Sequence, residues 1–308
     1  MTPETRKKIL TRAGWTALAL FSLTLFTLFK LPDDRIKDLI ESNLKPVLRQ
    51  NGITYTAADS SLSYLFGPSY ILKDVRLTFL PTRPTDTTST GHIDKLVVSP
   101  SLFSFLMGRT AGSFLIESEE GSLSGSFSSK PTKQSFSVRA KKFNLGKIGA
   151  IPPLLGIQGA AVLDGSASVA GDFAVPSSLE GDVDLQLSKA AISAQFISGF
   201  SIPPINLSEA VFRFSFASGK ATVKTLSLGK PGNPAQDLQG IITGDAVLGK
   251  DWYAGNLNLK ATFSISETLK KSFILIDAIL GQGKQADGSY AYQLTGPIAA
   301  PVPNPIKL

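Results

Sequence analysis

The stretch NLNLKATFSI, Asn256–Ile265, alternates apolar and polar side chains one for one. Leucine, alanine, phenylalanine and isoleucine occupy every second position, and asparagine, lysine, threonine and serine fill the positions between them. Successive side chains of a β-strand point to opposite faces, so this pattern predicts a strand with one apolar and one wet face. Antiparallel sheets show such alternation, whereas parallel sheets covered on both faces read as continuous apolar runs.

The same period of two recurs throughout residues 53–308, which predicts a mainly β protein with one large antiparallel, curved sheet that is apolar on one face. A two-sheet sandwich, a partly closed barrel and an open trough that accepts lipid chains all need this alternation, so all three stay open. The apolar rows are therefore candidates for either a closed core or a groove. The candidates are Leu102, Phe105, Leu106, Phe136, Val138, Val183, Leu185, Leu187, Phe212, Phe214, Phe216, Leu257, Leu259 and Phe263.

One short apolar run, LFSFLM at 102–107, interrupts the strand pattern. Pro100 should end the preceding strand, and Ser101 is placed to cap a short helical turn. Because one turn cannot bury Leu102, Phe103, Phe105, Leu106 and Met107 by itself, we expect this run to pack on the apolar face of the sheet. There it would seal the core or cover the groove.

The N-terminus predicts a membrane anchor. Residues 13–29 carry no charge between Arg12 and Lys30 and span about 26 Å as a helix. No small-x-small cleavage site follows, which favours an uncleaved anchor over a cleaved signal peptide. The basic residues at 6–12 predict a cytoplasmic N-terminus. The apolar side chains of the anchor are Trp15, Leu18, Leu20, Phe21, Leu23, Leu25, Phe26, Leu28 and Phe29.

The expected organisation is a cytoplasmic tail at 1–12, an anchor at 13–31, an amphipathic helix at 32–52 and a periplasmic β-rich domain at 53–308. The amphipathic helix either caps the sheet or lies on the membrane surface. A second helix should begin after the cap residue Ser266 and end at Gly281, with Leu269, Phe273, Ile276 and Leu280 as its apolar stripe. The chain has no cysteine, which excludes disulfides, thiol nucleophiles and Cys-ligated zinc, and fits the bacterial periplasm.

The residues that could carry chemistry favour structural roles. His92 is the single histidine and is interpreted as a strand-edge residue, and Asp182 and Asp184 as part of a solvated strand face. We expect no metal or cofactor and no enzyme activity, because no nucleophile, base and orienting group can be assembled. An envelope hydrolase is thereby disfavoured.

Positive charge is concentrated between Glu120 and Asp164, where no acidic residue occurs. This candidate basic patch is either a solvated strand face or a contact for anionic headgroups or an acidic partner protein. Nucleic acid is disfavoured because the domain is expected beyond the membrane and exposed aromatics are not interleaved. Its members are Lys130, Lys133, Arg139, Lys141, Lys142 and Lys147.

Several motifs together resemble the type II secretion system protein N family, within the wider AsmA-like group of periplasmic proteins. After the anchor and the amphipathic helix come LKDVRLTF, HIDKLVVSPSLFSFLMGR, a G-x-L-x-G strand at Gly121–Gly125 and NLGKIGAIPPLLGIQG. The closing order GNLNLKATFSIS, helix, DGSYAYQLTGPIAAP is also similar. The resemblance covers most of the chain.

This resemblance implies a bitopic inner-membrane protein that serves as an accessory component of the type II secretion system. Other envelope or secretion components would be its partners. The AsmA-like group implies the alternative, a lipid-binding or lipid-transfer protein of the cell envelope with phospholipid as ligand. No catalytic residue is implied. The chain is short for a lipid bridge between two membranes, which favours local lipid binding or partner docking.

Overall fold

The computed structural model describes residues 33–64, 67–80, 88–101, 103–104, 107–130, 132–149, 158–197, 200–230, 233, 236–272 and 276–307. The chain divides into two compact units, Met1–Leu48 and Arg49–Leu308.

The helix α2, Asp33–Gln50, forms where the apolar spacing of 3.6 predicts it. Two aspartates begin the helix and Arg49 lies in its last turn, so both ends carry charges that complement the helix dipole. Gly52 follows with φ of +72° and donates its amide to the Arg49 carbonyl, which ends the helix. Pro46 lies inside the helix without ending it.

Among the described residues, no helix is both long enough and apolar enough to cross a membrane. The expected anchor at 13–31 and all of its named side chains lie outside those residues.

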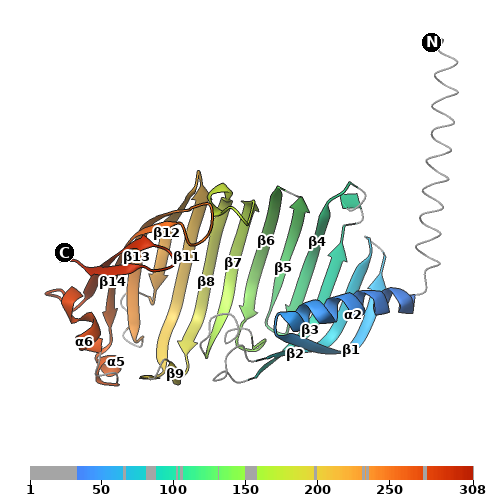
Figure 1. The fold of residues 1–308 in the computed structure, drawn as a ribbon. Coiled ribbons are helices and arrows are strands. Elements are labelled where there is room, and N and C mark those ends of the chain that lie inside the picture. Colours follow the sequence, from blue (N-terminus) through green and yellow to red (C-terminus); the bar gives the residue numbers. More distant parts are fainter. Residues whose placement is uncertain are drawn as a thin grey trace, which may run out of the picture. The chain divides into compact units, whose positions relative to one another are not determined.

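One antiparallel sheet of fourteen strands dominates the second unit (Figure 1). Every strand pairs with its neighbours along the chain, except that the small hairpin β9–β10 is left out between β8 and β11. The strands are β1 Ile53–Ser63, β2 Ser69–Phe79, β3 Ser89–Pro100, β4 Thr110–Ser118, β5 Gly121–Lys130, β6 Lys133–Asn144, β7 Gly159–Gly171, β8 Glu180–Ile192, β11 Ile205–Ala217, β12 Lys220–Leu228, β13 Leu238–Val247, β14 Asn256–Ile265, β15 Tyr290–Pro297 and β16 Val302–Pro305. The hairpin consists of β9 Gln195–Ile197 and β10 Phe200–Ile202.

The sheet is open, because β1 and β16 are its two edges and do not pair with each other. The mainly β, antiparallel prediction is confirmed. Among the described strands, the only sheet other than the large one is the two-stranded β9–β10. Neither a sandwich of two large sheets nor a closed barrel is therefore formed.

Bulges interrupt the strand pairing at several positions. The register between β6 and β7 shifts between Ala140 and Phe143, with Lys142 at φ of +47°. Similar shifts accompany Lys189 in β8 and Ser208 in β11, whose φ angles are +51° and +57°. Bulges bend a strand and increase its twist, and here they bring apolar residues on both sides of the bulge to the same face.

The C-terminal helical segments cover one end of the apolar face. They are α5 Glu267–Ser272, α6 Ile276–Leu280 and the 3₁₀ turn η2 Gly281–Gly283. Ser266 accepts a hydrogen bond from the Leu269 amide at 3.1 Å, which confirms the predicted cap. A single helix was expected here; helical residues occur at Glu267–Ser272 and Ile276–Leu280, and residues 273–275 between them, including the expected stripe residue Phe273, lie outside the described residues.

Candidate functional site: the apolar face of the open sheet

A continuous apolar row crosses all fourteen strands of the large sheet. Each member is the direct cross-strand partner of the next, and no member has a charged side chain. In strand order the row is Leu62, Tyr70, Val98, Phe114, Gly125, Val138, Ala167, Val183, Phe214, Val223, Gly244, Leu259, Leu294 and Pro303.

A second row runs beside the first, offset by two residues along most strands. In β12 the offset is three residues, from Val223 to Leu226, because the register shifts between them. Its central members are Leu123, Ala140, Gly165, Leu185, Phe212, Leu226 and Ile242. The strands of the large sheet from β1 to β14 are nine to thirteen residues long, so at about 3.3 Å per residue and about 4.8 Å between strands this face is about 30–40 Å high and about 60 Å wide. The first row is apolar over the whole width of the face, and the second row doubles it over the central strands β5 to β13.

The structure places eleven of the fourteen predicted apolar candidates on this face. Ten of them are half-buried, and Phe136 is 41% exposed. They do not form a closed core, because no second large sheet is present among the described strands to cover them. The other three, Leu102, Phe105 and Leu106, lie outside the described residues.

Two apolar side chains of the run before β4, Phe103 and Met107, are not buried as predicted. Ser101 accepts a hydrogen bond from the Ser104 amide at 3.3 Å, so the expected capped turn does form. Phe103 and Met107, however, are 72% and 57% exposed, because the turn projects from the end of the sheet. The expectation that these two side chains seal the apolar face is therefore wrong.

Aromatic rings cover glycines on the central part of the face. A Cβ atom at Gly125 would lie 2.6 Å from the ring of Phe114, so the ring lies against the bare backbone of the neighbouring strand. The Phe127 ring approaches Gly112 in the same way. Phe114 also stacks on Phe136 with 6.4 Å between ring centroids. Gly125 of the G-x-L-x-G motif thus leaves space for the Phe114 ring to lie flat on the sheet backbone.

Over β14 and β15 the apolar face is closed. Tyr290 is fully buried and stacks on Phe263 at 5.5 Å between ring centroids. Lys270 of α5 lies over the Tyr290 ring, and Tyr292 donates its hydroxyl to the Leu280 carbonyl at 3.0 Å. The described helical segments α5, α6 and η2 therefore form a lid over this end, and these contacts are with β15 and not with the central strands.

Residues 145–149, here called the strap, run from the end of β6 across the β4–β5 turn to β3. The His92 amide donates to the Lys147 carbonyl at 3.3 Å, and the Ser89 hydroxyl donates to the Gly149 carbonyl at 3.0 Å. The first half of β3 extends beyond the end of β4, so the strap occupies an edge that β4 leaves unpaired. Ile148 packs so closely on Gly91 that no side chain fits there.

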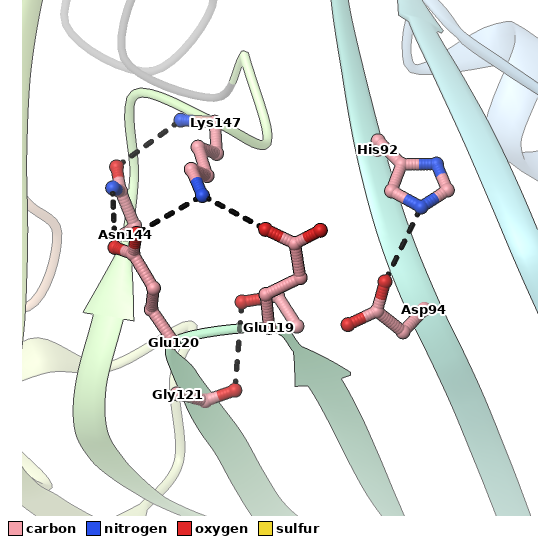
Figure 2. Close-up of polar contacts among 8 residues, drawn as sticks. His92, Asp94, Glu119, Glu120, Gly121, Asn144 and Lys147 are labelled. Carbon is pink, nitrogen blue, oxygen red and sulfur yellow. Dashed lines mark hydrogen bonds and ion pairs between the residues drawn. The ribbon is translucent and has the colours of Figure 1, made fainter.

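An ion-pair cluster holds the strap to the β4–β5 turn, as Figure 2 shows. The Lys147 Nζ lies 3.1 Å from a carboxylate oxygen of Glu119 and 3.0 Å from one of Glu120. Asn144 donates to the second Glu120 oxygen at 3.2 Å. Hydrogen bonds from Lys147 and Asn144 lower the pKa of Glu120, and those from Lys147 to Glu120 and Glu119 raise the pKa of Lys147.

The predicted basic patch is spread along β6 and is not gathered at one place. Lys130 and Lys133 face each other across the β5–β6 turn, Arg139 and Lys141 lie on the polar face, and Lys142 is at the bulge. Lys147 belongs to the strap. Serines surround the middle of this strip, with hydroxyl contacts of 2.9 Å between Ser126 and Ser137 and 2.8 Å between Ser128 and Ser135.

The carboxylates on the polar face make exposed ion pairs. Asp182 contacts Lys224 at 2.6 Å, and Asp184 contacts Arg213 at 3.0 Å, both on the face opposite the apolar rows. His92 is exposed and lies 3.3 Å from Asp94 (Figure 2). Within the part of the chain that the structure describes, no group of histidine and acidic residues could hold a metal ion.

Comparisons with known proteins give no match: no family model, no curated protein and no solved structure resembles this chain significantly.

Several residues of the apolar face were absent from the sequence prediction, among them Phe114, Leu226 and Tyr292. The alternation is irregular around both Phe114 and Leu226: Phe114 begins the apolar run Phe114–Ile116, and β12 changes phase between Val223 and Leu226, so the sequence did not show which face they occupy. The strap left no signal in the sequence either, because its contacts with Glu119 and His92 join residues 28 and 55 positions apart in the chain.

Proposed function

We propose that the apolar face of the sheet binds the acyl chains of lipids, in an envelope protein that residues 13–31 anchor to the inner membrane. The observation that carries this proposal is the uninterrupted row from Leu62 to Pro303, because its central members are half-buried and no second large sheet covers them among the described strands. A soluble monomer rarely exposes so large an apolar surface without a binding role.

Energetics favour a long apolar chain as the ligand. Each methylene group that leaves water contributes about 0.8 kcal/mol, so a ligand with a dozen buried methylenes gains about 10 kcal/mol before it loses conformational entropy. The central rows offer no charged group and few polar side chains, which disfavours ligands that need several hydrogen bonds. The flat surface that the Phe114 ring forms over Gly125 suits an extended acyl chain lying along the face.

Adjacent residues on opposite faces provide a test. Native mass spectrometry of the full chain should detect retained phospholipid, and Phe214→Lys should reduce the retained fraction strongly by placing an ammonium group in the apolar row. Ser215→Lys introduces the same side chain one residue later, on the polar face, and should leave lipid retention unchanged. Because both variants keep residues 13–31, lipid held by an anchor contributes equally. Equal retention in the two variants would refute the proposal.

A role as an accessory component of the type II secretion system is the second proposal, and it is compatible with the first. The observation that favours it is the edge strand β1, which is eleven residues long and pairs only with β2 among the described strands. The opposite edge, β16, contains Pro303 and Pro305, which cannot donate to a further strand. Co-purification with secretion components after mild crosslinking would support this role, and normal secretion in a deletion strain would contradict it.

A further inference from the structure

The register brings exposed apolar side chains and free cations together at one corner of the sheet. This corner lies where β3 ends at Pro100, β4 begins at Thr110, and the β5–β6 turn joins Lys130 to Lys133. Thr110 is the cross-strand partner of Ser129, so the turn before β4 lies beside the β5–β6 turn. Segments of the chain about 25 residues apart therefore form one surface.

The apolar part of the corner is held outward by its own hydrogen bonds. The Met107 amide donates to the Phe103 carbonyl at 3.2 Å, and the Arg109 amide donates to the Ser104 carbonyl at 2.9 Å. These bonds fix a turn whose Phe103 and Met107 side chains are mostly exposed. Because neither side chain is buried in this turn, neither contributes hydrophobic free energy to folding. Folding therefore does not explain why the two exposed positions are apolar.

The corner also forms an entrance to the apolar face. Phe127 and Phe136 are direct cross-strand partners on that face, at 39% and 41% exposure. From them the apolar surface continues inward through Phe114, which stacks on Phe136. An acyl chain that entered at the corner would therefore contact apolar side chains from Phe127 and Phe136 inward to Phe114.

Cations predominate at the corner. Arg109, Lys130 and Lys133 are exposed, and none of the described acidic residues lies within ion-pair distance of any of them. No acidic residue occurs between Asp94 and Glu117 or between Glu120 and Asp164. Asp172 follows Gly171, the cross-strand partner of Gln134, and so adjoins the Lys133 end of β6, but its carboxylate accepts the Ala174 amide and makes no ion pair with the three cations. The surface thus combines protruding apolar side chains with unneutralised cations.

From this combination we infer that the corner docks on a bilayer surface that contains anionic lipid, with Phe103 and Met107 entering the interface. Cations near an anionic leaflet are attracted to it, and adjoining apolar side chains gain from leaving water. The inference rests on the proposed acyl-chain binding and adds its entry point: lipid passes between the bilayer and the face over Phe127 and Phe136.

A second exposed tip serves as an internal control. Trp252 and Tyr253 are 49% and 76% exposed in the β13–β14 loop, but the adjacent Asp251 offsets the charge of Lys250. Asp251 also accepts the Tyr253 and Ala254 amides at 2.9 and 2.8 Å, which explains the shape of that turn. This tip has aromatic side chains without net positive charge, so it should contribute little to binding an anionic surface.

Because the chain has no cysteine, one introduced thiol can carry an environment-sensitive dye. The full chain with Met107→Cys, reconstituted in phosphatidylcholine nanodiscs and labelled with a nitrobenzoxadiazole dye, should show a blue shift and a rise in emission when phosphatidylcholine–phosphatidylglycerol vesicles are added. Pure phosphatidylcholine vesicles should give a much smaller change. The same dye at Ala286→Cys, an exposed position in the loop after η2, should not respond.

Adding Lys130→Glu and Lys133→Glu should weaken vesicle binding at least about tenfold, since each cation near an anionic leaflet accounts for a several-fold change. Trp252→Ser with Tyr253→Ser should leave it unchanged. No dye response to anionic vesicles, or a response only to a second copy of this chain, would overturn the inference. If the dye does not respond but Phe214→Lys still retains less phospholipid than Ser215→Lys, acyl-chain binding stands while the docking corner fails.

Discussion

The ring of Phe114 lies directly against the backbone of Gly125 on the neighbouring strand, within the row that crosses the whole sheet. A Cβ atom at Gly125 would also lie 2.5 Å from the Ser137 carbonyl oxygen, so the position is enclosed from both adjacent strands. This contact explains why a glycine sits in the middle of a strand, where it would otherwise weaken the sheet.

Gly125→Val should therefore destabilise the domain by about 1–3 kcal/mol, the usual cost of overpacking a well-packed site. Chemical denaturation followed by circular dichroism measures the change. Phe114→Ala in the same chain should recover part of the loss, because it removes the ring and leaves the Ser137 contact. Gly281→Ala is the matched control, since no atom lies within 4 Å of a Cβ at that position. An unchanged midpoint for Gly125→Val would show that the ring does not occupy this place.

The strap should loosen when its cation is removed. In Lys147→Met the two carboxylates of the β4–β5 turn lose their common partner, so the His92 amide that bonds to the Lys147 carbonyl should exchange its hydrogen faster. Lys142→Met removes a nearby cation whose side chain is in no described ion pair and should leave this amide protected. Equal protection in the two variants would mean that the backbone contacts alone hold the strap.

Acid should loosen the strap as well. The pKa of Glu120 is lowered in the folded protein, so its contribution to stability is fully present above the ordinary glutamate pKa and is lost as the pH falls through the lower folded value. The pKa of Lys147 is raised, so its contribution is fully present below its ordinary pKa and is lost only as the pH rises beyond it. The protection factor of the His92 amide should thus be constant near neutral pH and fall below about pH 4. In Glu120→Gln, the protection factor of the His92 amide should depend less on pH in the acid range. If this pH dependence is the same as in the unmodified chain, groups other than Glu120 cause it.

One side-chain hydrogen bond joins the C-terminal lid to β15. Tyr292→Phe leaves the Leu280 carbonyl without its 3.0 Å donor and should cost about 0.5–1.5 kcal/mol of unfolding free energy. Tyr253→Phe removes the hydroxyl of an exposed tyrosine and should change the unfolding midpoint little. Thermal unfolding of both variants compares them. Similar stability in the two would indicate that solvent replaces the lost donor at Leu280.

Alternation along single strands was enough to predict the class of fold and most of the apolar face, because Val183 and Phe214 need only their own strand to show which side they occupy. Whether the sheet closes could not be predicted, since strands of a sandwich, barrel or open sheet alternate alike. The sequence does indicate where two of the bulges lie. Lys141 and Lys142 separate Ala140 from Phe143, and Ser188 and Lys189 separate Leu187 from Ala190. Two polar residues in succession between apolar ones mark the register shifts.

Phe103 and Met107 were expected on the apolar face because they are apolar. Their exposure depends on the turn that Ser101 caps and on the direction in which it leaves β3, and hydrophobicity alone does not encode that direction.

Photocrosslinking at adjacent residues tests acyl-chain binding most directly. Val183 belongs to the central apolar row, and Asp184 is the next residue on the opposite face. With p-benzoylphenylalanine at each position in turn in the full chain, irradiation in the presence of labelled phospholipid should give a lipid adduct at position 183 and none at 184. Equal labelling at both positions, or a folded protein with no adduct at 183, would contradict the account.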